Sequence, residues 1–151
     1  EDLVEELLLM PLNMTATFNV TPKTVARMAV GINPDGTRAT VDPLGWEAPA
    51  GGLLASANDM AKWMKFHLRG DAPKGRGMPV DGTTVVEALA AQTALRDGTS
   101  AVGLPWEYKY SSGVWTKSKQ GELPGFRSSV TLVDSLGLGV FTSALQSDVP
   151  E

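Results

Sequence analysis

Short runs of alternating side-chain character fill the last third of this chain, and they constrain its fold more than any other feature. Period-two alternation over about four to eight residues predicts half-buried β-strands. Such runs lie near Glu107–Tyr110, Gly113–Lys119, Arg127–Val133 and Leu138–Ala144. Turn-forming residues fill Asp134 to Gly137, so we expect the last two runs to form a hairpin. The pattern therefore predicts an antiparallel sheet.

Helical patterns precede these strands. The clearest runs from Ser56 to Leu68, where Ser56 and Asp59 have the spacing of a capping box. Its apolar and aromatic residues recur at helical spacing: Met60, Trp63, Met64, His67 and Leu68. Helices followed by an antiparallel meander predict an α+β fold.

Two further helices are expected, one on each side of this segment. The first covers Asp2 to Met10, with Leu3, Leu7 and Met10 on one face. The second begins at Thr83 or Thr84 and runs to about Leu95, where Asp97-Gly98 closes it.

The remaining segments are assigned from the turn-forming and helix-breaking residues that they contain. Ala26–Ile32 is a plausible strand, followed by a turn at Asn33–Gly36 and a second short run at Thr37–Val41. Prolines and glycines make Pro43–Gly52 a loop and Gly70–Asp81 a surface connector.

Composition excludes several functions. The net charge of -4 and the pI near 5.0 argue against binding of nucleic acid, which needs a basic surface. No apolar run approaches the roughly 18–20 residues that a transmembrane helix needs. With no cysteine and a single histidine, the chain has no disulfide, thiolate site or multi-histidine metal site, and we expect no metal and no cofactor.

A motif occurs where the second of these strands ends. Lys119-Gln120-Gly121 is followed by Leu123-Pro124-Gly125-Phe126. This order resembles the serine β-lactamase and penicillin-binding-protein family, in which a Lys-Thr-Gly or His-x-Gly strand and a Pro-Gly-Phe-like turn form one wall of the active site. Three more segments resemble the family in the same order: Pro11–Thr17, Pro49–Phe66 and Gly103–Tyr108. The last resembles the eukaryotic β-lactamase-like proteins.

The resemblance implies a partial β-lactamase/transpeptidase-like fold. Residues 1–151 would be a single partial domain, the C-terminal half of a β-lactamase-like domain. The sequence begins inside a predicted helix and stops just after a strand-like run, which suggests that it is cut from a longer protein.

The resemblance also implies site residues. Lys119 would be a catalytic residue in the electropositive wall around the nucleophile, and the backbone N–H of Glu122 would complete the oxyanion hole. Gln120, Gly121 and Glu122 would bind substrate, although Gln120 replaces the usual Thr or Ser and removes a hydroxyl. The residues alone allow another interpretation, in which Lys119 and Lys117 are solvated lysines on an outward strand face.

Other candidate residues have simpler explanations. Ser56-Ala57-Asn58 matches a Ser-x-Asn motif but stands at a helix entry, where capping explains Ser56. His67 lies on the apolar helix face, so packing is favoured over a Ser-His-Asp triad. Asp134 is interpreted as a turn residue. Some aromatic residues could form a sugar platform, but their alternation favours core and cross-strand packing: Trp63, Trp106, Trp115, Tyr108 and Tyr110.

The sequence contains neither the Ser-x-x-Lys nucleophile motif nor the Tyr-x-Asn motif of the family. We therefore expect a fragment of a serine hydrolase that transfers acyl groups from a small-molecule amide or ester, inactive by itself. The alternative is a non-catalytic binding or scaffold domain that keeps the fold, which Gln120 favours.

Two sequons, Asn13-Met14-Thr15 and Asn19-Val20-Thr21, lie close together. They point to a secreted eukaryotic parent unless they are coincidental, and they leave the compartment open.

The resemblance also implies that the N-terminal strand and helix and the C-terminal helix, which complete and cover this sheet in the family, are absent from residues 1–151. We expect uncovered apolar surface at Val130, Leu132, Val140 and Phe141, and hence poor solubility, oligomers or a marginal fold.

Overall fold

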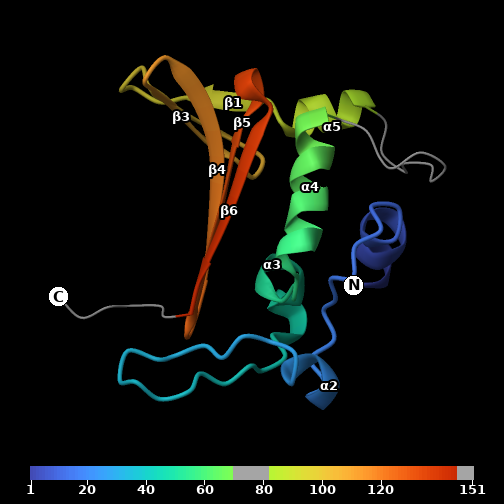
Figure 1. Cartoon of the computed structure of the whole chain (residues 1–151). Coiled ribbons are helices and arrows are strands. Elements are labelled where there is room, and N and C mark those ends of the chain that lie inside the picture. Colours follow the sequence, from blue (N-terminus) through green and yellow to red (C-terminus); the bar gives the residue numbers. More distant parts are fainter. Residues whose placement is uncertain (70–81, 146–151) are drawn as a thin grey trace.

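The computed structural model describes residues 1–69 and 82–145 (Figure 1). Its helical elements are α1 (Asp2–Val4), η1 (Glu5–Leu9), α2 (Pro22–Val25), η2 (Gly45–Glu47), α3 (Ala48–Gly51), α4 (Ala57–Arg69), α5 (Gly82–Ala88) and η3 (Asp134–Leu136). Its strands are β1 (Ala91–Ala94), β2 (Ser100–Gly103), β3 (Glu107–Ser111), β4 (Val114–Leu123), β5 (Phe126–Val133) and β6 (Leu138–Ala144). The connector predicted at Gly70–Asp81 lies outside the described residues.

The sheet is a meander. Its six strands pair antiparallel in chain order, so each strand neighbours the one before it in sequence. All four strands predicted after Leu104 are present, and the predicted α+β class is confirmed. The hairpin at Asp134 to Gly137 is also confirmed, with η3 in the turn and Gly137 at φ 59°.

The two strands that the prediction missed are β1 and β2. The helix expected to reach Leu95 ends at Ala88, and Ala91 to Ala94 pairs with β2 instead. The reason is the Asp97 side chain, which accepts hydrogen bonds from the backbone N–H groups of Thr99 and Ser100 at 2.9 and 2.8 Å. Asp97-Gly98 therefore closes a β-hairpin rather than a helix.

Helix α4 covers one face of the sheet (Figure 1). The core between them contains Trp106, Val130 and Leu132, with several partly buried side chains packed against it, Trp63, Met64 and Leu68 of α4 among them. Gly139 allows the helix to approach β6, because a Cβ there would lie 3.0 Å from Met64 Sδ. The predicted apolar face of α4 is confirmed by these contacts.

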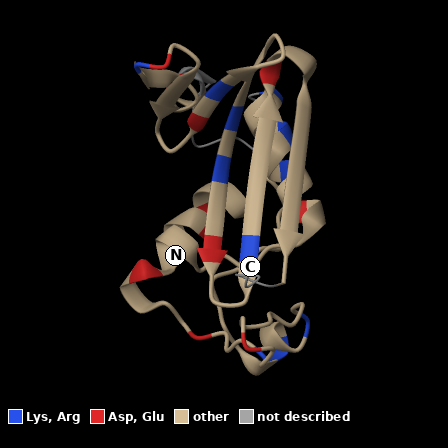
Figure 2. Ribbon diagram, turned by 90° about the vertical axis from the view of Figure 1, so that its left-hand side faces the viewer, with Lys and Arg blue, Asp and Glu red and all other residues tan. Residues whose placement is uncertain are grey.

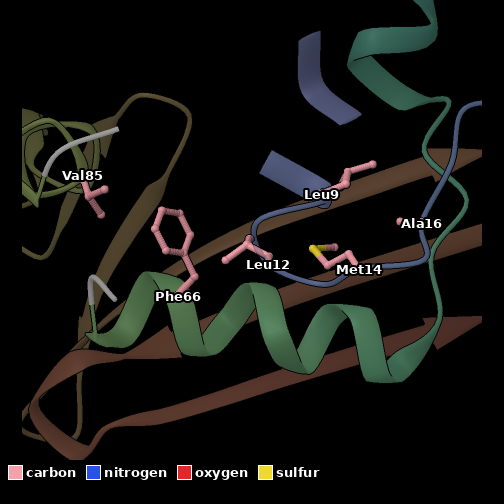
Figure 3. Packing of buried hydrophobic residues seen from close by; sticks show 6 residues of the cluster. All are labelled: Leu9, Leu12, Met14, Ala16, Phe66 and Val85. Atoms are coloured by element: carbon pink, nitrogen blue, oxygen red, sulfur yellow. The ribbon is translucent and has the colours of Figure 1, made fainter. Parts of the chain in front are cut away.

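A second core lies on the other side of α4. It joins residues from the N-terminal segment, α4 and α5: Leu9, Leu12, Met14, Ala16, Phe66 and Val85 (Figure 3). Phe66 thus gives α4 a second buried face that the periodicity did not predict. The helix is buried on two sides, which fixes it between the N-terminal segment and the sheet.

The N-terminal helix packs through a different face from the one predicted. Leu3, Leu7 and Met10 are 69%, 43% and 56% exposed, whereas Leu9 is buried. The Met10 N–H donates to Glu5 O, a five-residue step typical of a π-turn. This wider turn rotates the later side chains away from the positions that a regular α-helix would give them.

The prediction for the loop region is partly wrong. Ala26–Ile32 does not form a strand, because α2 is set by a capping box between Thr21 and Thr24, and turns follow it. Only Ile32 makes an isolated bridge, with Arg38. The turn at Asn33–Gly36 is confirmed by a 2.9 Å hydrogen bond from Gly36 N–H to Asn33 O.

The prediction of uncovered apolar residues is correct for one of its four positions. Val130 and Leu132 are buried, and Phe141 is partly buried against the same core. In-register partners share a face, so Phe141 follows Val130 toward α4, and Val140 pairs with Thr131 on the other face. Val140 alone is 47% exposed.

Candidate active-site wall

The second half of β4, from Lys119 to Leu123, has one edge that pairs with no described strand. Strand β3 pairs with β4 only as far as Ser118, while β5 pairs with it as far as Leu123. Within residues 1–69 and 82–145, no strand therefore pairs with the β3 side of Lys119 to Leu123. Because Leu123 and Phe126 close a two-residue loop, ladder alternation directs the N–H groups of Gln120 and Glu122 to this open edge.

Lys119 stands at the start of this edge. Its side chain is 47% exposed, and its ammonium lies 3.1 Å from Glu107 Oε1, whose side chain is 60% exposed. An ion pair in water stabilises a fold by at most about 1 kcal/mol. The lysine is thus free to exchange Glu107 for another anionic partner.

The three predicted substrate-binding residues follow Lys119 along the strand. Alternation places Lys119 and Gly121 on one face and Gln120 and Glu122 on the other. All three line an open pocket of about 520 Å³, together with hydroxyl side chains of β5 and β6: Ser128, Ser129, Thr142 and Ser143. Lys119 does not line this pocket, and the roles given to these residues stay predictions.

Glu122 has a cationic neighbour across the hairpin. Its Oε1 accepts hydrogen bonds from Arg127 Nε at 3.2 Å and from Nη2 at 2.9 Å. Both side chains are about half exposed. The pair fixes the end of the hairpin without using the backbone N–H of Glu122.

The turn at Leu123–Phe126 is held against the loop of residues 31–39. Gly125 has φ 77°, and a Cβ on it would lie 2.3 Å from the Cβ of Ala39. A Cβ on Gly31 would lie 2.5 Å from the Phe126 ring. Both glycines are needed for this close approach, which sets the position of the open edge.

Lys117 has a different environment, although it belongs to the same strand and face. Its side chain is only 3% exposed, and Nζ donates to Asp134 Oδ2 at 2.7 Å. The interpretation of Lys117 as an outward, solvated lysine is wrong. Asp134 lies in the turn, as predicted, but it also neutralises this buried ammonium, and no local sequence signal indicated that.

His67 is a packing residue, as predicted. Its ring centroid lies 3.7 Å from that of Trp63 and 5.7 Å from that of Trp106, and its Nδ1 lies 3.0 Å from Trp63 O. Burial lowers the pKa of His67 to about 4, and the nearby Lys117 ammonium acts in the same direction. In the described part of the chain, His67 is hydrogen-bonded to no serine hydroxyl and no carboxylate, so it forms no triad there.

The capping role of Ser56 is also confirmed. Ser56 Oγ donates to Asp59 Oδ2 at 2.7 Å, and Asp59 N–H donates back to Ser56 Oγ at 3.1 Å. Thr15 adds hydrogen bonds to Asp59 from its N–H and its hydroxyl at 2.8 and 3.1 Å. Burial alone would raise the pKa of Asp59, but these hydrogen bonds outweigh it and lower the pKa.

The aromatic side chains divide into two groups. Trp63 and Trp106 pack in the core with ring centroids 5.7 Å apart, as predicted. Tyr110 and Trp115 are direct cross-strand partners at 5.4 Å, yet they are 44% and 47% exposed. Burial in the core accounts for Trp63 and Trp106, whereas Tyr110 and Trp115 form a cross-strand pair that stays half exposed.

The described residues offer neither a metal site nor a membrane-spanning helix. Residues 1–69 and 82–145 contain no cluster of three or more His, Cys, Asp or Glu side chains arranged to hold a metal ion. None of the described helices is long and apolar enough to cross a membrane. Acidic and basic residues are interspersed along the ribbon (Figure 2).

Comparison with known proteins identifies the family. The Beta-lactamase family model matches residues 1–150. Beta-lactamase-like protein 2 of Dictyostelium discoideum is 33% identical over 158 aligned residues, which cover 100% of this chain and 28% of that protein. Beta-lactamase-like protein 1 of the same organism is 32% identical, over 95% of this chain and 26% of its own length. The chain therefore belongs to the β-lactamase family.

The fold agrees with this assignment. A class C β-lactamase from Rhodobacter sphaeroides matches with a TM-score of 0.78 at 18% identity, over 97% of this chain and 49% of that chain. The chain thus spans about a quarter of the length of these curated relatives and about half of this solved structure. The resemblance to serine β-lactamase-like proteins and penicillin-binding proteins is confirmed.

Proposed function

We propose that this chain supplies the sheet-side wall of the acyl-transfer site of a serine β-lactamase-like hydrolase. The observation that supports it best is the open edge of β4 from Lys119 to Leu123. Its backbone donors are directed to the side where no described strand pairs, and a substrate carbonyl can approach them there. Family membership adds independent support.

In this proposal the nucleophile comes from a part of the parent protein outside the printed sequence. A serine oxygen attacks the carbonyl carbon of a small amide or ester, and the carbonyl oxygen becomes an oxyanion. The Glu122 N–H donates to that oxyanion, and the Lys119 ammonium stabilises negative charge beside the nucleophile. The proton of the serine hydroxyl passes to the leaving group, which departs as the amine or alcohol, and water then hydrolyses the acyl-enzyme to the free acid and restores the serine hydroxyl.

The first test uses the isolated chain of residues 1–151. The purified chain should turn over neither nitrocefin nor p-nitrophenyl acetate above a Lys119→Ala control, because loss of a serine nucleophile costs on the order of 10⁶ in turnover. Measurable Lys119-dependent turnover would show that the residues present here suffice, and the proposal of an external nucleophile would fail.

The second test uses the parent protein. Lys119→Ala should lower its kcat for the same substrates by roughly 10²–10³, the usual effect of removing one transition-state donor. Lys109→Ala is the matched control, since Lys109 is also exposed and lies on the neighbouring strand β3. Equal effects of the two substitutions would argue against a role for Lys119.

A non-catalytic binding or scaffold domain is the alternative. Gln120 favours it, because its amide replaces the hydroxyl of the Lys-Thr-Gly motif that this segment resembles. The reading frame upstream of Glu1 decides between the two. A Ser-x-x-Lys followed by a Tyr-x-Asn supports the hydrolase, and a complete gene without them supports the alternative.

A further inference from the structure

A second pocket lies at the other end of β4, beside the buried Lys117–Asp134 pair. It encloses about 310 Å³, the lower end of the range for small-ligand sites. Its walls include Tyr108, Lys117 and Leu132, which are in-register partners and so share one face of the sheet. Trp115 belongs to the same wall, two positions before Lys117 on β4.

The polar groups of this pocket form a pair with unused hydrogen-bonding capacity. An ammonium has three donors, and within the described residues Lys117 uses one of them, toward Asp134 Oδ2. The Asp134 side chain remains 60% exposed, so its carboxylate can accept from a ligand. The Ser135 hydroxyl, which can donate or accept, completes this side of the pocket.

The charge of the pair limits the ligand class. Lys117 and Asp134 neutralise each other at 2.7 Å, so an anion would meet the carboxylate and a cation would meet the ammonium. A neutral molecule with neighbouring hydroxyl groups avoids both repulsions, because one hydroxyl can accept from Lys117 while the next donates to Asp134. The half-exposed Trp115 ring offers an apolar face beside them.

We propose that this pocket binds a neutral sugar, with Trp115 stacked on the ring and the Lys117–Asp134 pair bonded to adjacent hydroxyls. The site is separate from the Lys119 edge, since it shares no lining residue with the pocket beside Gln120, Gly121 and Glu122. The proposal does not depend on the proposed acyl-transfer function.

The test follows the indole N–H signals of the chain by NMR while methyl β-glucopyranoside is added. The Trp115 signal, assigned from Trp115→Phe, should shift and saturate in the millimolar range that a few contacts allow. Trp115→Ala should weaken binding at least tenfold. Trp46→Ala is the matched control, because Trp46 is 88% exposed and does not line the pocket, and it should change nothing.

Asp134→Asn gives a second, independent variant, which keeps the side-chain shape and should weaken sugar binding several-fold. Acetate and ethylammonium serve as small anionic and cationic probes. The proposal is overturned by a sugar response that does not saturate, by unchanged affinity in Trp115→Ala, or by tighter binding of either charged probe. It is also overturned if the parent protein shows no sugar response at Trp115.

Discussion

The two halves of β4 each present a lysine to the same face of the sheet, but only one of the two lysines is open to solvent. We call residues 114–118, with Lys117, the closed end, and residues 119–123, with Lys119, the open end. Lys117 is 3% exposed and 2.7 Å from Asp134, whereas Lys119 is 47% exposed and 3.1 Å from Glu107. The difference comes from the neighbouring elements. The turn that contains η3 supplies the partner of Lys117, while β3 pairs no further than Ser118.

The same residue type therefore serves two purposes on one strand. A buried ammonium needs its partner, because an uncompensated charge in the interior costs several kcal/mol. An exposed ammonium is solvated whether or not its partner is present. The closed end of β4 should thus determine stability, and the open end should be available for chemistry.

The largest effect that we expect depends on pH through His67 of α4, which lies close enough to Lys117 and Asp134 to sense their charges. In the unfolded chain His67 takes up a proton below its ordinary pKa of 6.5, but burial lowers the folded pKa to about 4. Between these values the unfolded state binds more protons, so stability falls as the pH falls. From about pH 7.5 to about pH 4.5 the free energy of unfolding should fall by about 2.5 kcal/mol.

Urea unfolding at several pH values measures this dependence. His67→Phe is the control, since phenylalanine fills the site between Trp63 and Trp106 without titrating. The variant should lose most of the slope between about pH 6.5 and about pH 4.5. A wild-type curve that is flat in this window would show that His67 is protonated as easily in the fold as outside it.

The second prediction concerns how much each carboxylate partner, Asp134 of Lys117 and Glu107 of Lys119, stabilises the fold. Asp134→Ala should lower the free energy of unfolding by about 2 kcal/mol, less than for a fully enclosed pair because Asp134 itself is 60% exposed. Glu107→Ala removes the partner of Lys119 and should cost less than about 0.5 kcal/mol. Chemical denaturation of both variants gives the two numbers, and similar losses would contradict the contrast between the ends.

The sequence predicted the parts of this arrangement that depend on local pattern. Alternation located β3 to β6, and the Ser56–Asp59 spacing located the start of α4. The family and its fold could be recognised from short motifs that follow one another in order between Pro11 and Phe126. These signals lie within short windows, where each residue's neighbours in the sequence are also its neighbours in space.

Some errors concern local turns, such as the Asp97 turn and the π-turn after Glu5, and the sequence also does not show contacts between distant segments. Lys117 and Asp134 are 17 positions apart, and their pairing depends on the register between β4 and β5. Thr15 reaches Asp59 across 44 positions, and Leu9 is buried because a π-turn changes the spacing of the N-terminal helix. No periodicity contains the Lys117–Asp134 and Thr15–Asp59 contacts, since each joins residues that only the folded chain brings together.

The smallest effect on the free energy of unfolding is expected at Lys119. Lys119→Ala should change the free energy of unfolding by less than about 0.5 kcal/mol, because the side chain is 47% exposed and its only described partner is the exposed Glu107. Thermal and urea unfolding of this variant beside Lys109→Ala should give two nearly superimposable curves. If so, any loss of acyl transfer in the parent protein carrying Lys119→Ala reports on chemistry rather than on folding. A loss above about 1 kcal/mol would mean that Lys119, like Lys117, belongs to the packed structure, and the open end of β4 would no longer be a separate region.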